Sequence, residues 1–162
     1  MSTPAKPSAA TPRSFESFEV GETHDSPVRT LLAEDVAAFA DLTGDRNPIH
    51  LDPEFARTTV FRKPIAHGLF LASILAGMAF DRGLLGRNLL AIERSEEQYL
   101  QPVRLGEQIR GTVRITAKDP DASKRCGRVT WELTLLRLSE GKETVAVQAL
   151  WKTLVFKEAF LR

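Results

Sequence analysis

The second half of the chain alternates apolar with polar residues, which is the period of a β-strand. One such run carries apolar side chains at Val129, Trp131, Leu133 and Leu135, and the same alternation occupies 109–116 and 145–155. A period of two places the apolar side chains of a strand on one face of a sheet. The turn-like stretch SEGKE separates the last two runs. We expect three or four long antiparallel strands, with a weaker and more polar strand over 91–103.

A different pattern fills residues 65–80, which read IAHGLFLASILAGMAF. Apart from His67 and Ser73, every position is apolar or small, so the pattern predicts a helix that is buried on all sides. The segment is too short to span a membrane comfortably. A sheet with one apolar face needs an element to bury, and this helix is the obvious one. The sequence therefore predicts an α+β fold, with a curved antiparallel sheet wrapped around helix 65–81.

Shorter helical segments are expected before the buried helix. The run AEDVAAFADLTG has apolar residues at helical spacing and ends at Gly44, which suits a helix C-cap. A second short helix begins after Asp52, where an N-cap residue precedes a proline. Between them, Pro48 lacks a backbone donor and disfavours helical geometry at Asn47. We therefore expect residues 45–50 to form a turn between two helical pieces.

Composition limits the classes of function that remain. A chain of 162 residues normally forms one domain, and residues 1–13, rich in Pro, Ala and Thr, read as a disordered tail before a single domain over 14–162. The 22 basic and 21 acidic residues are well mixed and give a net charge of +1, so neither nucleic acid nor a membrane surface is an expected partner. Cys126 is the only cysteine, which excludes an internal disulfide and argues against structural zinc. Without an apolar signal segment, we expect a cytoplasmic protein.

The stretch GDRNPIH holds the first candidate chemistry, with Asp45 five residues before His50. Asp and Asn are common in turns because they bond their own backbone, so a structural role is one interpretation. The other is an acid and an imidazole that face the same water molecule. Gly68 favours the second, because it lies at the expected start of the buried helix, where free N–H groups attract negative charge. An acid/base pair and an oxyanion donor are the parts needed to add or remove water beside a carbonyl.

Two further polar residues flank this stretch. His67 precedes Gly68, and its ring suits either a packed histidine at the helix start or a group that supports the site. Ser73 lies within the apolar helix, where its hydroxyl can bond the backbone of the preceding turn instead of serving the site. Both alternatives stay open for each residue.

Residues 42–73, LTGDRNPIHLDPEFARTTVFRKPIAHGLFLAS, closely resemble the hydratase motif of MaoC-like dehydratases and R-specific enoyl-CoA hydratases. The similarity extends more loosely to FEVGE, AEDVAAFADLTGD and QPVRLGEQI, and so covers roughly 15–157. The resemblance implies a hot-dog fold, in which an antiparallel sheet wraps around a long central helix. It also implies hydration of a trans-2-enoyl-CoA to a 3R-hydroxyacyl-CoA, or the reverse dehydration.

The resemblance also assigns roles to individual residues. Asp45 and His50 would form the catalytic pair that holds one water, with Asp45 as the favoured base and His50 relaying a proton toward C2. Gly68 would donate its backbone N–H to the thioester oxygen. Asn47, Ser73 and His67 would support the site or bind substrate. The resemblance implies no metal and no cofactor beyond the CoA or phosphopantetheine of the substrate. It also implies that the protein forms a homodimer or a larger homo-oligomer of dimers.

The chain departs from the family pattern at three places. It reads DRGLLGRN over 81–88 where many R-specific hydratases carry a Pro-Gly-x-Gly turn, it has a polar SEEQY in the following strand, and it has Glu107 where Asp is usual. The first two leave the acyl-chain length and the standard substrate open. The alternative substrate is a 3-hydroxyacyl thioester of acyl-carrier protein, as in fatty-acid or polyketide synthesis. A hot-dog thioesterase and a non-catalytic acyl-thioester-binding module are further alternatives.

Overall fold

The computed structural model describes residues 13–139 and 141–161. Its helices and strands, in chain order, are η1 (Phe15–Ser17), β1 (Thr23–Asp25), β2 (Arg29–Thr30), α1 (Ala33–Thr43), α2 (Pro48–Leu51), α3 (Pro53–Thr58), α4 (Gly68–Asp81), β3 (Leu89–Tyr99), β4 (Gln108–Asp119), η2 (Pro120–Ala122), β5 (Cys126–Ser139), β6 (Lys142–Phe156) and η3 (Glu158–Phe160). In these residues, no helix is long and apolar enough to cross a membrane.

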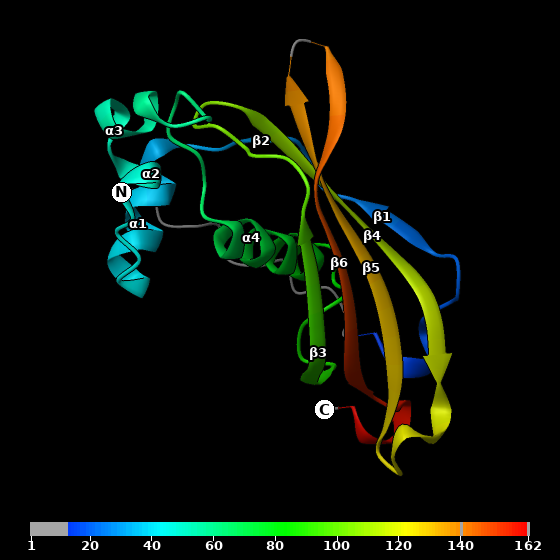
Figure 1. The fold of residues 1–162 in the computed structure, drawn as a ribbon. Helices are drawn as coiled ribbons and strands as arrows, with labels where there is room; N and C mark the ends of the chain where they lie inside the picture. Colours follow the sequence, from blue (N-terminus) through cyan, green and yellow to red (C-terminus); the bar gives the residue numbers. More distant parts are fainter. Residues whose placement is uncertain (1–12, 140, 162) are drawn as a thin grey trace.

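The strands form one antiparallel sheet in the order β1-β4-β5-β6-β3, and β2 pairs with the N-terminal end of β4. The three runs of alternating residues lie in β4, β5 and β6, and the weaker, more polar strand expected over 91–103 is β3, which covers Leu89–Tyr99. The sheet twists and curves around α4, which lies across its concave face (Figure 1). This is the α+β hot-dog arrangement expected from the sequence, and the prediction of fold class is confirmed.

The inward side chains of the sheet and one side of α4 make the core. Leu75 and Ala79 of α4 are fully buried, as are Trp131, Leu133 and Leu135 of β5. Phe18 packs edge-on against Trp131 with ring centroids 5.2 Å apart, so the segment before β1 closes one end of this core. The alternation read in β5 therefore points its apolar residues toward α4.

Only one side of α4 is covered, so the prediction of a helix buried on all sides is wrong for this chain by itself. Leu69 and Phe80 keep 68% and 45% of their surface exposed, and Ser73 and Gly77 are exposed beside them. One sheet can cover only one face of a helix, and the described chain supplies no second layer. The helix begins at Gly68, as expected for the candidate oxyanion donor, and not at the first residue of the predicted range 65–81.

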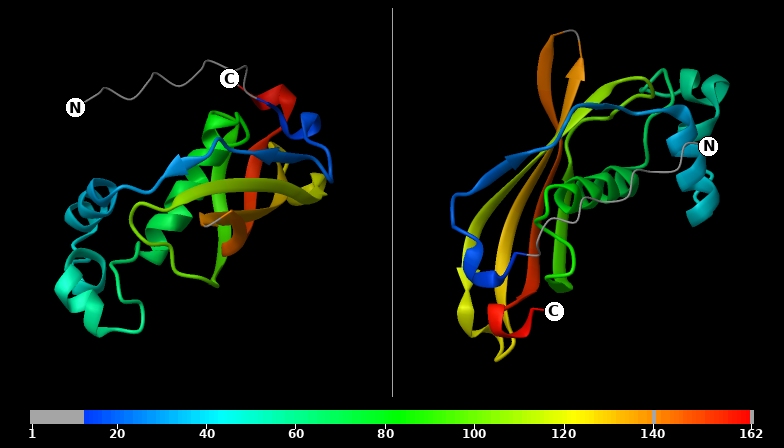
Figure 2. Two further views of the ribbon diagram at one scale, coloured as in Figure 1. Left: turned by 90° about the horizontal axis from the view of Figure 1, so that it is seen from above. Right: turned by 180° about the vertical axis from the view of Figure 1, so that it is seen from behind.

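The three short helices gather beyond one end of α4, away from most of the sheet (Figures 1 and 2). α1 ends at Thr43, and Gly44 is its C-cap, as the sequence predicted; the φ of 80° at Gly44 is left-handed and suits glycine. Asp52 caps α3 through two hydrogen bonds from backbone N–H groups, of Glu54 at 2.9 Å and Phe55 at 3.1 Å. These caps hold the chain on both sides of the Asp45–His50 stretch.

The expectation that 45–50 is only a turn is wrong in its second half. Pro48 is the first residue of α2, a single helical turn that contains His50. A proline is tolerated at a first helical position because that N–H has no partner inside the helix. Asn47 avoids helical geometry, with φ of −56° and ψ of 126°, as the residue before a proline should, and its side chain accepts a hydrogen bond from the Ile49 N–H at 3.1 Å.

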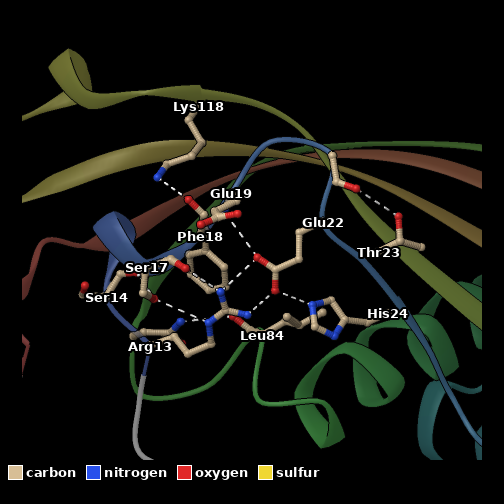
Figure 3. A network of polar contacts seen from close by, with 12 residues as sticks. Arg13, Ser14, Ser17, Phe18, Glu19, Glu22, Thr23, His24, Leu84 and Lys118 are labelled. Atoms are coloured by element: carbon tan, nitrogen blue, oxygen red, sulfur yellow. Dashed lines mark hydrogen bonds and ion pairs between the residues drawn. The ribbon is translucent and has the colours of Figure 1, made fainter.

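Residues 1–12 of the expected disordered tail lie outside the described residues, but its last residue, Arg13, packs on the domain. The Arg13 guanidinium pairs with Glu22 and lies 4.3 Å from the centre of the Phe18 ring (Figure 3). Glu22 also contacts Nε2 of His24 at 2.5 Å. These contacts tie the beginning of the described chain to the segment that enters β1.

Candidate functional site

The Asp45, His50 and His67 side chains form one cluster at the N-terminal end of α4. One side-chain nitrogen or oxygen from each lies within 4.8 Å of those of the other two. The Asp45 side chain is exposed, His50 is half-buried and His67 is buried. The structure thus brings together three residues that the sequence singled out, from two segments separated by α3.

The orientation of His50 is set by a backbone carbonyl group. Its Nδ1 lies 2.7 Å from the carbonyl oxygen of Ile65. A carbonyl oxygen only accepts, so Nδ1 carries the hydrogen, and the neutral ring presents Nε2 as an acceptor. Burial lowers the pKa of His50 below its usual 6.5, as does His67, against the opposing effects of the Ile65 hydrogen bond and the Asp45 charge. His50 is therefore suited to accept a proton near neutral pH.

Asp45 is held mainly through its backbone and short local bonds. Its backbone N–H donates to Oγ1 of Thr43 at 3.3 Å, and its carboxylate accepts from the Asn47 N–H at 3.3 Å. Its carbonyl oxygen accepts a hydrogen bond from Nε2 of His67 at 3.0 Å. The carboxylate keeps most of its lone pairs free toward solvent, where a water molecule can donate to it.

Gly68 begins α4 directly beside the cluster. Among the described residues, no acceptor takes a hydrogen bond from its backbone N–H. A Cβ at this position would lie 3.0 Å from Cε1 of Tyr99, so the tyrosine ring packs directly on the glycine. A free N–H at a helix start is a suitable donor for a developing oxyanion.

The two remaining candidates serve local structure. The Asn47 side chain caps α2 and so supports His50 through the helix that carries it. The Ser73 hydroxyl donates to the Leu69 carbonyl oxygen at 2.9 Å, which is the local bond weighed as an alternative from the sequence. Ser73 makes no hydrogen bond to the cluster within the described chain. It lines a separate cavity of about 380 Å³ between α4 and residues 26–29. A role for Ser73 in the site stays a prediction.

A metal ion fits this cluster poorly, for a reason that lies in His67. Its Nε2 donates to a carbonyl oxygen and therefore carries a hydrogen, so it has no lone pair for a metal. Its other nitrogen, Nδ1, is buried without access to solvent or to a hydrogen-bond partner among the described residues. Asp45 and His50 alone offer two ligands, fewer than the three or four protein ligands usual for zinc.

Sequence reasoning missed Tyr99 and the Ile65 carbonyl group. Tyr99 lies on β3, far along the chain from Gly68, and it was noted only as part of an unusually polar strand. The polarity now has a simple explanation, because β3 is an edge strand and most of its residues are exposed. The Ile65 contribution comes from its backbone, which no residue type reveals.

The known proteins that are similar to this chain point to one family. Residues 15–135 match the family model of the MaoC-like domain. The chain is 42% identical over 108 residues to the (R)-specific enoyl-CoA hydratase of Aeromonas caviae. The aligned residues cover 67% of this chain and 78% of that protein. It is 32% identical over 135 residues to the (R)-specific enoyl-CoA hydratase of Rhodospirillum rubrum, covering 83% and 92% of the two chains.

A solved structure extends the similarity to three dimensions. The monoamine oxidase regulatory protein from Archaeoglobus superimposes with a TM-score of 0.82 at 31% identity, over 90% of this chain and 95% of that one. The two enzyme relatives are hydratases, which are hydro-lyases by reaction class. The chain therefore belongs to the MaoC-like domain family, among its hydratase and dehydratase enzymes.

Proposed function

We propose that this chain adds water to the double bond of a trans-2-enoyl-CoA to give the 3R-hydroxyacyl-CoA, or catalyses the reverse dehydration. The observation that carries the proposal is the arrangement of Asp45, His50 and Gly68, two proton acceptors beside a free backbone donor. The relatives named as (R)-specific enoyl-CoA hydratases support the substrate and the stereochemistry.

In the proposed reaction, one water donates its two hydrogens to the Asp45 carboxylate and to Nε2 of His50. As the water oxygen bonds to C3, one proton passes to Asp45 and the double-bond electrons move toward the thioester oxygen. The Gly68 N–H stabilises that oxygen as it becomes negative. Nε2 of His50 then takes the second hydrogen of that water from the new C3 hydroxyl group and delivers it to C2, while Asp45 returns its proton to the same oxygen. A hydroxyl and a hydrogen have then been added, and both side chains regain their starting charge.

The functional unit in this proposal is at least a homodimer. Among the described residues, β3 is an edge strand with no strand paired along its outer side, and it exposes Leu90 and Ile92. An edge of this length with exposed apolar residues is a natural pairing surface. Sedimentation of the purified protein tests this point: we expect a dimer or a multiple of it, and Ile92→Glu should shift the protein toward the monomer. A wild-type monomer at assay concentrations would contradict it.

The direct test follows the loss of enoyl-thioester absorbance when purified protein is mixed with crotonyl-CoA. The product is then offered to dehydrogenases specific for the R or the S alcohol, and we expect oxidation only by the R-specific enzyme. The same assay with a crotonyl group on acyl-carrier protein separates the two carriers. S product would refute the proposed stereochemistry. Absence of turnover of short and longer enoyl groups on either carrier would refute the proposed function.

A further inference from the structure

His67 lies between two aromatic rings beneath the candidate site. Its ring is 2% exposed, and its centroid lies 3.8 Å from that of His50 and 5.1 Å from that of Phe39. The planes of the two histidines are inclined by only 33°, so the rings are stacked. His67 therefore fixes the plane in which the His50 ring can lie.

Hydrogen bonds join the segment 45–50 to the segment 65–67 in both directions. His50 donates to the carbonyl oxygen of Ile65, and His67 donates to the carbonyl oxygen of Asp45. The Ile65 N–H donates in turn to the Ile49 carbonyl oxygen at 3.3 Å. Each segment thus orients an imidazole of the other, and His67 is the residue that links Asp45 to the start of α4.

The two nitrogens of His67 lie in different surroundings. Nδ1 is buried and has no hydrogen-bond partner among the described residues. A phenyl ring would fill the same space without leaving an unpaired acceptor. The feature that only the imidazole supplies here is the Nε2–H bond to Asp45.

We propose that His67 is a positioning residue for the hydration proposed above: through its Nε2–H bond and its contact with the His50 ring, it holds the Asp45 backbone and the His50 ring in place beside the Gly68 N–H. It takes no proton during the reaction. A misplacement of reacting groups by about 1 Å can lower a rate by about 100-fold, so a residue that sets these distances affects turnover more than binding.

Three variants separate the hydrogen bond from the ring. His67→Phe keeps the bulk and the stacking but removes the donor. His67→Gln places an amide N–H near the position of Nε2, and His67→Asn places it near Nδ1. We expect kcat to fall by about 10- to 100-fold in His67→Phe and His67→Asn, with KM within about 3-fold of wild type, and kcat to recover largely in His67→Gln.

Nitrogen-15 spectra of the imidazole groups test the proposal without any activity. In wild type at neutral pH we expect hydrogen on Nε2 of His67, which donates to the Asp45 carbonyl oxygen, and on Nδ1 of His50, which donates to the Ile65 carbonyl oxygen. In His67→Phe we expect the His50 signals to shift or broaden as its ring loses its fixed orientation. Absence of turnover by wild type would refute the proposed function, while these spectra would still test the positioning role.

Several results would overturn the inference. One is a wild-type spectrum in which Nε2 of His67 carries no hydrogen, because the bond to the Asp45 carbonyl oxygen would then be absent. A second is a His67→Phe variant with wild-type kcat and unchanged His50 spectra. A third is a well-folded His67→Gln that is as slow as His67→Asn, because the Nε2–H bond to Asp45 would then not be the important contact.

Discussion

Two backbone carbonyl groups decide which nitrogen of each imidazole is free in the candidate site. The Ile65 oxygen accepts from Nδ1 of His50, and the Asp45 oxygen accepts from Nε2 of His67. Only His50 is left with an accessible lone pair, while the free nitrogen of His67 is buried. The two histidines therefore have different chemistry although they stack on each other, and only His50 suits the work of a base.

The pH dependence of turnover follows from the environment of His50. Burial and the neighbouring His67 hold the pKa of His50 below its usual 6.5. The reaction needs the neutral ring, so activity falls only when the pH drops through this lowered pKa. We expect the acidic limb of kcat/KM against pH to lie below 6.5 in wild type. A limb at or above 6.5, or one that survives in His50→Gln, would contradict the assignment of that limb to His50.

The contact between Gly68 and Tyr99 gives a second prediction at this scale. Alanine keeps the backbone N–H, but its Cβ would lie 3.0 Å from Cε1 of Tyr99, so the ring or the helix start must move by a few tenths of an ångström. We expect Gly68→Ala to lower kcat by roughly 10-fold. In the Tyr99→Ala background, the same substitution should cost much less.

Gly77→Ala is the matched control, because a Cβ there, in the same helix, meets no atom within 4 Å. It should leave kcat near the wild-type value. If Gly68→Ala costs as much with Tyr99 removed as with it present, the ring is not the cause of the loss.

At the scale of elements, the close contact between α4 and the sheet depends on a glycine in β4, Gly111, which has no side chain. A Cβ on Gly111 would lie 2.5 Å from Sδ of Met78 and 3.3 Å from Cδ2 of Leu75, both on α4. We expect Gly111→Ala to lower the free energy of unfolding by about 1–3 kcal/mol, because overpacking forces side chains out of their preferred rotamers. Urea unfolding measures this, with Gly86→Ala as control, since its nearest contact would be an ordinary 3.7 Å. An equal effect of both substitutions would contradict the explanation.

At the scale of the whole molecule, the beginning of the described chain is held by a charge cluster. Arg13 and, to a smaller extent, His24 and the Glu19 N–H lower the pKa of Glu22 from 4.5 to about 2, against the opposing effect of burial (Figure 3). This difference corresponds to at most about 3 kcal/mol of folding free energy. Because the folded-state pKa is the lower one, the stabilisation is complete above about pH 4.5 and is lost as the pH falls toward 2.

We therefore expect Glu22→Gln to be less stable than wild type at neutral pH, by about 1–3 kcal/mol in urea unfolding. The difference should shrink between about pH 4.5 and pH 2. Glu19→Gln, on an exposed neighbour, is the control and should change little. A difference between wild type and Glu22→Gln that stays constant down to pH 2 would show that the charge of Glu22 is not responsible.

The sequence predicts the sheet, the central helix and the cluster of Asp45, His50 and Gly68 because each leaves a local signal: a period of two, an apolar run, or a motif. It does not predict that Pro48 starts a helix, since the same residue is equally suited to a turn and the decision depends on the Asn47 cap. Contacts such as Tyr99 on Gly68 join distant residues through the fold and leave no local pattern. The exposed face of α4 is made of apolar and small residues, as is its buried face, so the sequence pattern cannot distinguish the two faces.

The most direct test of the account compares initial rates of crotonyl-CoA hydration by wild type, Asp45→Asn and His50→Gln, after urea unfolding has shown that all three are folded. Each substitution removes one of the two groups that accept hydrogens from the reacting water. We expect both variants to lose about 100-fold or more in kcat, as is usual when a general acid or base is removed. If either folded variant retains a rate within about 3-fold of a catalytically active wild type, the proposed Asp45–water–His50 mechanism is wrong.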